Sequence, residues 1–357
     1  MVLEILTVNN PLISVCIPLY DTEPFLEQCL RSVITQDFES FEIVIVSDAS
    51  RGCDGNGRNA KKIVRLAEKE CKKFRKEKNL PSVSFRFIEH RENRGLIEVR
   101  RTLAYEAKGL YLTQVDSDDE MAENALNFLY SSAQKYNSDI THGTSTAGIF
   151  DDNGNFTPCQ ENRYGKIYYG LIKNDVLKRW LLDSPFTANT WGKLIRRELF
   201  IKAYENIPYT QCNMADDVLL FFFIGLYAKS YVGIEEKVYR YRVNTGMSSA
   251  RKIDSLKKWS MICSTASVFS IISEWIKNNE KSGVGASLSE EEIKSIRRMT
   301  TFYLANNLKQ LSETVIPELQ SQAREMLCEY WGASFVERVE GSVRNLSSDR
   351  GCHTDWK

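Results

Sequence analysis

Four acidic side chains crowd into the segment QVDSDDE, residues 114–120. They are Asp116, Asp118, Asp119 and Glu120, and they follow the short apolar run GLYLT. Carboxylates packed this closely repel one another, and removing them from water is costly unless a cation or hydrogen-bond donors compensate them. The cluster is therefore either a turn exposed to water or the binding site of a metal ion.

The residues before the cluster alternate between predicted strands and predicted helices. Buried apolar strands are expected at residues 12–20, 41–50, 83–90 and 110–116. Helices with one apolar face are expected between them, at residues 24–38, 60–78 and 96–107. This order predicts an α/β fold with a mostly parallel central sheet flanked by helices on both faces.

Three acids lie at or just beyond the ends of these strands. Asp21 follows the first strand, Asp48 lies in the last residues of the second, and Asp116 ends the fourth. In parallel sheets the carboxyl ends of the strands meet at one edge, where ligands bind. We therefore expect these acids on a common rim, which favours a binding site over a solvated turn.

The alternation weakens after about residue 137. Strands are expected at 138–150 and 237–244, and helices at 174–182, within 190–203 and at 218–228. Beyond residue 250 the chain is predicted to be helical, and Ser289 with Glu292 fits a capping box that opens one of these helices. The predicted organisation is one domain over residues 1–250, divided into two halves (12–120 and 121–250), followed by a helical region over 251–357.

The composition excludes several classes of protein. Lys plus Arg and Asp plus Glu both number 47, so the formal net charge is zero and no nucleic-acid partner is predicted. Nine cysteines without a CxxC pair, and no signal peptide at the N-terminus, indicate reduced thiols in a cytosolic protein. No apolar run is long enough to span a bilayer, and the most apolar segment, 218–228, is predicted to be a buried core helix.

Known motifs narrow the chemistry further. The sequence contains no P-loop, no GxGxxG after its first strand, no HExxH or Cys/His cluster for zinc, and no GxSxG elbow. What remains is a rim of carboxylate oxygens. Such ligands suit Mg²⁺ or Mn²⁺, which commonly bridge a few protein carboxylates and a substrate diphosphate.

Over roughly residues 12–250 the sequence resembles the inverting family 2 glycosyltransferases of the GT-A fold. The segments SVCIPLYDTEPFLEQCL, FEIVIVSDAS, NRGLIEVRRTLAYEAKGLYLTQVDSDDEM, WGKLIRRELF and ADDVLLFF are similar to family segments in the same order and spacing. Ser47 departs from the pattern by replacing the first acid of the second-strand pair, and Asp216-Asp217 stands where the family has Glu-Asp. No Gln-x-x-Arg-Trp follows, so nothing indicates a processive, membrane-embedded synthase. The family's motif positions are matched by Asn93, Gly95, Arg100, Gly109, Tyr111, Asp116, Asp118 and Asp119.

The resemblance implies a metal and donor site at the rim. Asp118 would bind Mn²⁺ or Mg²⁺, and Asp116 would face the ribose or the shell of the metal. Asp48 would accept a hydrogen bond from the uracil imide, although an acid after a strand also commonly caps a helix. The base and ribose pocket would be lined by Pro18, Tyr20 and Glu23.

The resemblance also implies a catalytic base. Asp217 would take the proton from the acceptor hydroxyl, with the adjacent Asp216 as the second candidate. Alternatively, both acids only stabilise the N-terminus of the helix that follows them. Arg100 would approach the diphosphate or orient the acids, or would form a helix-surface pair with Glu98 or Glu106.

Three further residues are predicted to contact substrates, and each has a purely structural alternative. Arg242 and Ser248 would close over the diphosphate, or would belong to an ordinary strand and loop. Trp191 would stack on an acceptor sugar, although a Trp beside an apolar helix is commonly part of the core.

The function implied is inverting, metal-dependent transfer of a hexose or N-acetylhexosamine from a UDP-sugar to a hydroxyl of a glycan or lipid-linked glycan, in polysaccharide or glycoconjugate biosynthesis. The alternatives are a sugar nucleotidyltransferase, which would need a Gly-rich loop that PLYDTEPF lacks, and a nucleotide-sugar- or carbohydrate-binding protein without turnover. The expected location is the cytoplasm or the inner face of the membrane. The C-terminal helices are candidates for peripheral membrane contact or for homo-oligomer formation.

Overall fold

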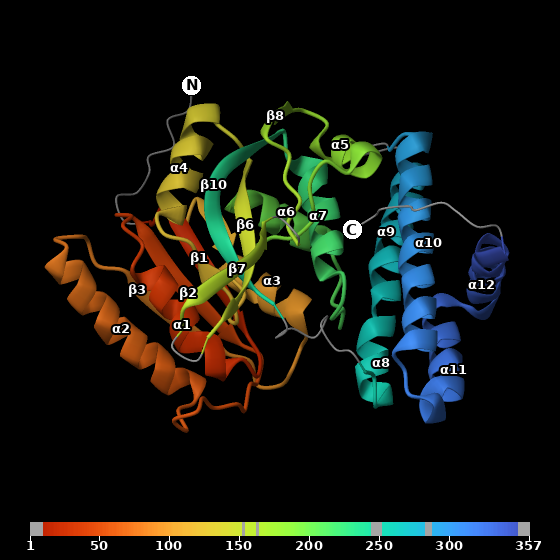
Figure 1. Ribbon diagram of the computed structural model, residues 1–357. Helices are drawn as coiled ribbons and strands as arrows, with labels where there is room; N and C mark the ends of the chain where they lie inside the picture. Colours follow the sequence, from red (N-terminus) through yellow and green to blue (C-terminus); the bar gives the residue numbers. More distant parts are fainter. Residues whose placement is uncertain (1–9, 152–153, 162–163, 244–251, 283–287, 349–357) are drawn as a thin grey trace.

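The computed structural model describes residues 10–151, 154–161, 164–243, 252–282 and 288–348. Figure 1 shows a body of sheet and helices on one side and a group of C-terminal helices on the other. The α/β prediction is confirmed. The domain boundary predicted at residues 250 and 251 falls at a gap between the described ranges, and Ser248 lies outside the described residues.

The first half is a parallel sheet with crossover helices. Its strands are β1 (Ile13–Leu19), β2 (Phe41–Ser47), β3 (Ser84–Glu89) and β4 (Tyr111–Gln114), and β1 pairs in parallel with both β2 and β4. Every residue of β1, β2 and β4 is buried, as expected for strands covered on both faces. The connecting helices are α1 (Glu23–Ile34), α2 (Ala60–Glu77) and α3 (Leu96–Glu106).

The second half extends the same sheet. The strand order is β3-β2-β1-β4-β9-β6-β10-β5, with β7 on β6 and β8 on β10. Strand β9 (Lys193–Arg196) runs antiparallel to both β4 and β6, and so joins the two halves. The other elements are β5 (Glu120–Met121), α4 (Ala125–Tyr136), β6 (Ile140–Phe150), β7 (Phe156–Glu161), β8 (Gly170–Lys173), α5 (Val176–Asp183), α6 (Arg197–Asn206), α7 (Asp216–Tyr227) and β10 (Ser230–Arg242).

The structure corrects one prediction and adds to others. Residues 193–196 form β9, so the helix expected within 190–203 begins only at Arg197, as α6. Strands β5, β7 and β8 were not predicted. All of these strands have two to six residues, too few for an apolar period to identify.

The C-terminal region is helical, as predicted. It comprises α8 (Leu256–Cys263), α9 (Thr265–Ser282), α10 (Glu290–Glu313), the 3₁₀ turn Pro317–Leu319, α11 (Gln320–Trp331) and α12 (Ala333–Ser348). The predicted capping box of Ser289 and Glu292 is present at the start of α10. Among the described helices, none combines the length and apolar character needed to cross a membrane.

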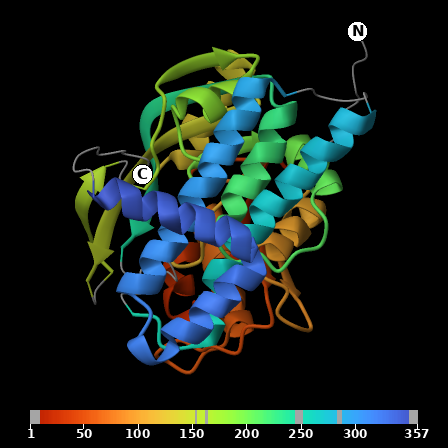
Figure 2. The same ribbon diagram turned by 90° about the vertical axis from the view of Figure 1, so that its right-hand side faces the viewer.

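The C-terminal helices share the main hydrophobic core. Phe269 and Ile272 of α9 and Ile296 of α10 belong to the same buried cluster as the apolar face of α7. A second cluster lies among the C-terminal helices around Trp259, whose indole N–H donates to the carbonyl of Ala323 at 2.7 Å. Figure 2 shows these helices covering one side of the molecule. The helical region is therefore packed against the sheet domain.

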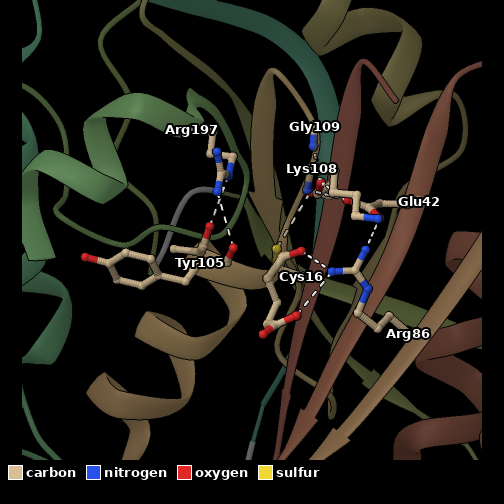
Figure 3. A network of polar contacts seen from close by, with 10 residues as sticks. Cys16, Glu42, Arg86, Tyr105, Lys108, Gly109 and Arg197 are labelled. Carbon is tan, nitrogen blue, oxygen red and sulfur yellow. Dashed lines mark hydrogen bonds and ion pairs between the residues drawn. The ribbon is translucent and has the colours of Figure 1, made fainter. Parts of the chain in front are cut away.

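A polar network stabilises the end of the sheet where the parallel strands begin (Figure 3). Glu42 of β2 is 2% exposed, and one of its oxygens accepts from the Ser14 hydroxyl at 2.7 Å and from the Lys108 amide at 2.6 Å. Its other oxygen lies 3.4 Å from the guanidinium of Arg86. The Ser14 hydroxyl also accepts from the amide of Gly109, where a Cβ would lie 2.5 Å from the Ser14 nitrogen. Glu42 therefore ties the start of β4 to β1 and β2.

We expect Glu42→Ala to lower the free energy of unfolding by about 3 kcal/mol, since removing one partner of a buried ion pair leaves the others uncompensated. Denaturant unfolding monitored by circular dichroism measures the change. Glu39→Ala removes an exposed acid three positions away and should leave the unfolding midpoint almost unchanged. Similar midpoints for the two variants would contradict the role given to Glu42.

Candidate active site

The acidic cluster forms a turn at the carboxyl end of β4. The amide of Asp119 donates to the carbonyl of Asp116 at 2.9 Å, which closes the turn. Asp116 and Asp118 are partly exposed, whereas Ser117 and Asp119 are buried. Asp116 and Asp118 therefore both reach solvent from this turn.

Strand β10 holds this turn in place. The Tyr239 hydroxyl donates to Asp119 Oδ2 at 2.8 Å and accepts from the Asp116 amide at 3.1 Å. The Arg242 amide donates to Asp119 Oδ1 at 2.7 Å. Burial, followed by the charges of Asp118 and Asp116, raises the pKa of Asp119 well above its usual range. Tyr239 and Asp119 lie 120 positions apart and no local pattern links them, so their contact could not be predicted from the sequence.

The side chain of Arg242 also supports the turn. Its Nε donates to the Asp118 carbonyl at 2.8 Å and its Nη2 to Gln28 Oε1 at 2.6 Å. The guanidinium lies 3.8 Å from the ring centroid of Phe150, within the range of a cation–π contact. Contact between Arg242 and a diphosphate stays a prediction.

Arg100 joins the acid turn to the start of α7. Its guanidinium donates to Asp116 Oδ1 at 3.3 Å and to Asp216 Oδ2 at 2.5 Å. Arg100 therefore contacts an acid at each end, and Glu98 pairs instead with Arg101 at 2.8 Å. That Arg100 orients these acids for catalysis stays a prediction. Arg100 is 4% exposed, and its Nε has no partner among the described residues.

Asp216 and Asp217 occupy the first turn of α7, where carboxylates are favoured by the helix dipole. Asp216 is buried against Arg100, whereas Asp217 is partly exposed and lines a cavity of about 340 Å³. The preceding residue, Ala215, has a φ of 59°, an unusual conformation for alanine. A residue that could not adopt this positive φ would change the start of α7 and the direction of both carboxylates. The two candidate bases therefore have different surroundings, and only Asp217 faces the cavity.

We expect Asp216 to stabilise the metal-free protein as the pH falls. Burial raises its pKa from 3.8 to about 6, opposed by Arg100 and reinforced by the charges of Asp217 and Asp116. Because the folded protein holds this proton more tightly than the unfolded chain, the contribution of Asp216 to the free energy of unfolding rises as the pH drops through about 6 and is complete below 3.8. Asp216→Asn cannot titrate, so urea unfolding between about pH 7 and about pH 4 should show a smaller gain, or a larger loss, than in the unmodified protein. Parallel pH curves for the two proteins would contradict this assignment.

The residues predicted to bind the base and ribose gather near the ends of β1 and β2. Tyr20 is 46% exposed, and Pro18 is buried within β1 opposite Val46. Glu23 is fully buried; one carboxylate oxygen accepts from the Ser50 hydroxyl at 2.6 Å, and the other has no partner among the described residues. An unpartnered buried carboxylate oxygen is costly, so this atom is a good candidate to accept a ligand hydroxyl.

Asp48 lies beside these residues, but its carboxylate already accepts hydrogen bonds from other residues of the protein. Its Oδ1 accepts from His90 Nδ1 at 2.7 Å and from the Arg94 amide at 2.9 Å. Its Oδ2 accepts from the Gly95 amide at 2.9 Å. Asp48 thus anchors the start of α3, close to the helix-capping alternative. Its contact with uracil stays a prediction, which requires these bonds to be shared or exchanged.

Trp191 lies beneath the turn. It is 7% exposed and stacks on Tyr239, with ring centroids 4.7 Å apart. This placement favours the core alternative over contact with an acceptor sugar, which stays a prediction.

The acid turn fits a divalent cation of the Mg²⁺ or Mn²⁺ type. Asp116 and Asp118 supply carboxylate oxygens at a partly exposed position, and a cation of this type takes its other ligands from water and substrate phosphates. The described part of the chain has no cluster of three or more metal-binding side chains, so a closed site made by protein alone is not built there.

Comparison with known proteins identifies relatives of this chain. A family model described as Glycosyl transferase family 2 matches residues 14–203, more than half of the 357 residues. Glycosyltransferase GlyA of Streptococcus pneumoniae is 28% identical over 243 residues, 66% of this chain but only 31% of GlyA, so the chain spans about a third of that relative. Glycosyltransferase GlyG of the same organism is 27% identical over 249 residues, 69% of this chain and 75% of GlyG.

A solved structure shares the fold. The crystal structure of S. aureus TarS 1–349 in complex with UDP-GlcNAc superposes with a TM-score of 0.51 at 19% identity, covering 93% of this chain and 91% of that one. The similarity extends over the C-terminal helices and confirms the GT-A type of fold. The family match covers β1 from its second residue through β4, and so includes the acid turn at the end of β4. This protein therefore belongs to glycosyl transferase family 2.

Proposed function

We propose that the protein is an inverting glycosyltransferase that moves a hexose or N-acetylhexosamine from a UDP-sugar to a hydroxyl of a glycan or lipid-linked glycan. One observation carries the proposal: Arg100 bridges Asp116 of the acid turn and Asp216 at the start of α7. A candidate donor-binding group and a candidate base would thereby be held in one ion-paired network.

Asp118 and Asp116 would hold Mn²⁺ or Mg²⁺, which when bound offsets the negative charge of the departing diphosphate. Tyr20, Glu23 and Asp48 are the candidates to position the nucleoside. The unpartnered oxygen of Glu23 supports a contact with a ribose hydroxyl. Tyr239 and Arg242 would keep the acid turn in its binding geometry.

Asp217 would accept the proton of the acceptor hydroxyl while that oxygen attacks the anomeric carbon opposite the leaving UDP. A single displacement of this kind inverts the configuration of the sugar. A positioned general base contributes about 10²–10⁴ in rate. Asp216 would hold Arg100 and set the charge around Asp217, because it is buried and ion-paired.

Family membership speaks against a sugar nucleotidyltransferase. We also propose a glycosyltransferase domain over residues 1–250 and a helical region over 251–357. The proposed location is the cytoplasm. The C-terminal helices are proposed to serve in peripheral membrane contact or in self-association. Since the TarS complex contains UDP-GlcNAc, that compound is the first donor to test.

Calorimetric titration of UDP with and without Mn²⁺, followed by UDP release from a panel of UDP-sugars, tests the proposal. We expect metal-dependent UDP binding and turnover of one sugar. Binding without hydrolysis or transfer of any sugar would indicate a binding protein. No UDP binding under either condition would overturn the donor site.

A further inference from the structure

The cavity beside Asp217 lies between the sheet domain and the C-terminal helices. Its volume is about 340 Å³, and α5, α7 and α10 all contribute to its wall. Trp180, Phe302 and Tyr303 contribute aromatic rings to its lining, and Asn189 adds an amide. Flat apolar surfaces with a few polar groups are typical of small-molecule sites, and a sugar ring fits this description.

The walls of the cavity are held firmly. The Ser295 hydroxyl of α10 donates to the Leu181 carbonyl of α5 at 2.5 Å, and the next residue, Ile296, is buried in the main core. On the other side, the fully buried Nζ of Lys193 donates to the carbonyls of Thr187, at 3.0 Å, and of Asn189. The cavity is thus formed before any ligand arrives.

Two charged side chains line the described cavity, and they differ in sign. Asp217 is the proposed base, and Arg298 comes from α10. The side chain of Arg298 is exposed and makes no hydrogen bond or ion pair within the described parts of the chain. Burial and the charge of Asp217 raise the pKa of the Tyr303 hydroxyl, which therefore stays a neutral donor beside the base. A cation without a protein partner at the wall of an aromatic cavity calls for an anion from the ligand.

We propose that this cavity binds the acceptor, and that the acceptor is a sugar or polyol carrying a phosphate or carboxylate group. Its accepting hydroxyl lies at Asp217, its ring or chain lies against Trp180 and Phe302, and its acid group pairs with Arg298. The proposal rests on the proposed function, whose base it uses. The family match ends at residue 203, so α7 and α10 lie outside it. The two charged contacts to the acceptor, Asp217 and Arg298, therefore come from a part of the chain that the family model does not cover.

NMR titrations of the full chain, with the donor site filled by UDP and Mg²⁺, test this inference with glucose, glucose 6-phosphate and glucuronate. We expect the unmodified protein to bind at least one of the two acids about tenfold more tightly than glucose, and Arg298→Gln to lose that preference. Which acid is preferred tells phosphate from carboxylate. Arg297→Gln removes the same charge from the adjacent, exposed position of α10, which does not line the cavity, and should keep the preference.

Equal binding of all three compounds, or equal losses in Arg298→Gln and Arg297→Gln, would overturn the inference. These outcomes do not depend on turnover. Failure of the proposed function would appear separately, as no UDP release from any UDP-sugar by the unmodified protein.

Discussion

Asp217→Asn should reduce kcat for sugar transfer by about 10²–10⁴ while leaving UDP affinity in Mn²⁺ unchanged. Asparagine keeps the size of the side chain but cannot take the proton of the acceptor hydroxyl. Asp217 has no ion pair with Arg100, which is held by Asp116 and Asp216 instead, so the substitution should not disturb the acid turn. Steady-state transfer assays and UDP calorimetry on the same preparation measure both effects.

Asp216→Asn is the matched control, because it changes the adjacent residue in the same way. This variant loses the ion pair to Arg100 and should shift both donor affinity and stability, but it retains the carboxylate that faces the cavity. Its kcat should therefore fall less than that of Asp217→Asn. The reverse order of the two losses would show that Asp216 is the base.

The position of the acids at one edge of the sheet could be predicted well from the sequence. Parallel strands place their carboxyl ends on one edge, so the positions of Asp48 and Asp116 after apolar runs were enough to bring them to a common rim. The start of α7 was equally predictable, since its acids precede a long buried helix. In each case a local pattern determined the position of the residue.

Contacts between distant segments could not be predicted in this way. Tyr239 and Asp119 meet because β10 pairs with β5, a strand of two residues that no period reveals. The bonds that occupy Asp48 come from the loop before α3, which folds back over the end of β2. The wall that α10 gives to the cavity depends on helix packing across more than a hundred residues. These features follow from tertiary packing, for which a single sequence carries no periodic signal.

Asp118→Ala should abolish the metal dependence of UDP binding. In Mn²⁺ we expect UDP affinity to fall by about 10–100-fold, the range found when even the partners of metal ligands are removed. Without metal we expect the same substitution to leave UDP affinity unchanged or to raise it, because removing a carboxylate lessens the repulsion of the diphosphate. The turn itself should survive, since its closing bonds come from Asp116, Asp119 and Tyr239. Calorimetry of UDP with and without Mn²⁺ measures both effects.

Glu123→Ala is the control for charge alone, because Glu123 is an exposed acid close to the turn. It should bind UDP like the unmodified protein under both conditions. Asp217→Asn should also bind UDP like the unmodified protein. Asp118 and Asp217 would then differ in their effect on UDP affinity as well as in their role in transfer. If Asp118→Ala and Asp217→Asn bound UDP equally well in Mn²⁺, the metal would have to sit elsewhere. The acid turn would then be a structural feature held by Tyr239, Arg242 and Arg100, without a metal-binding role.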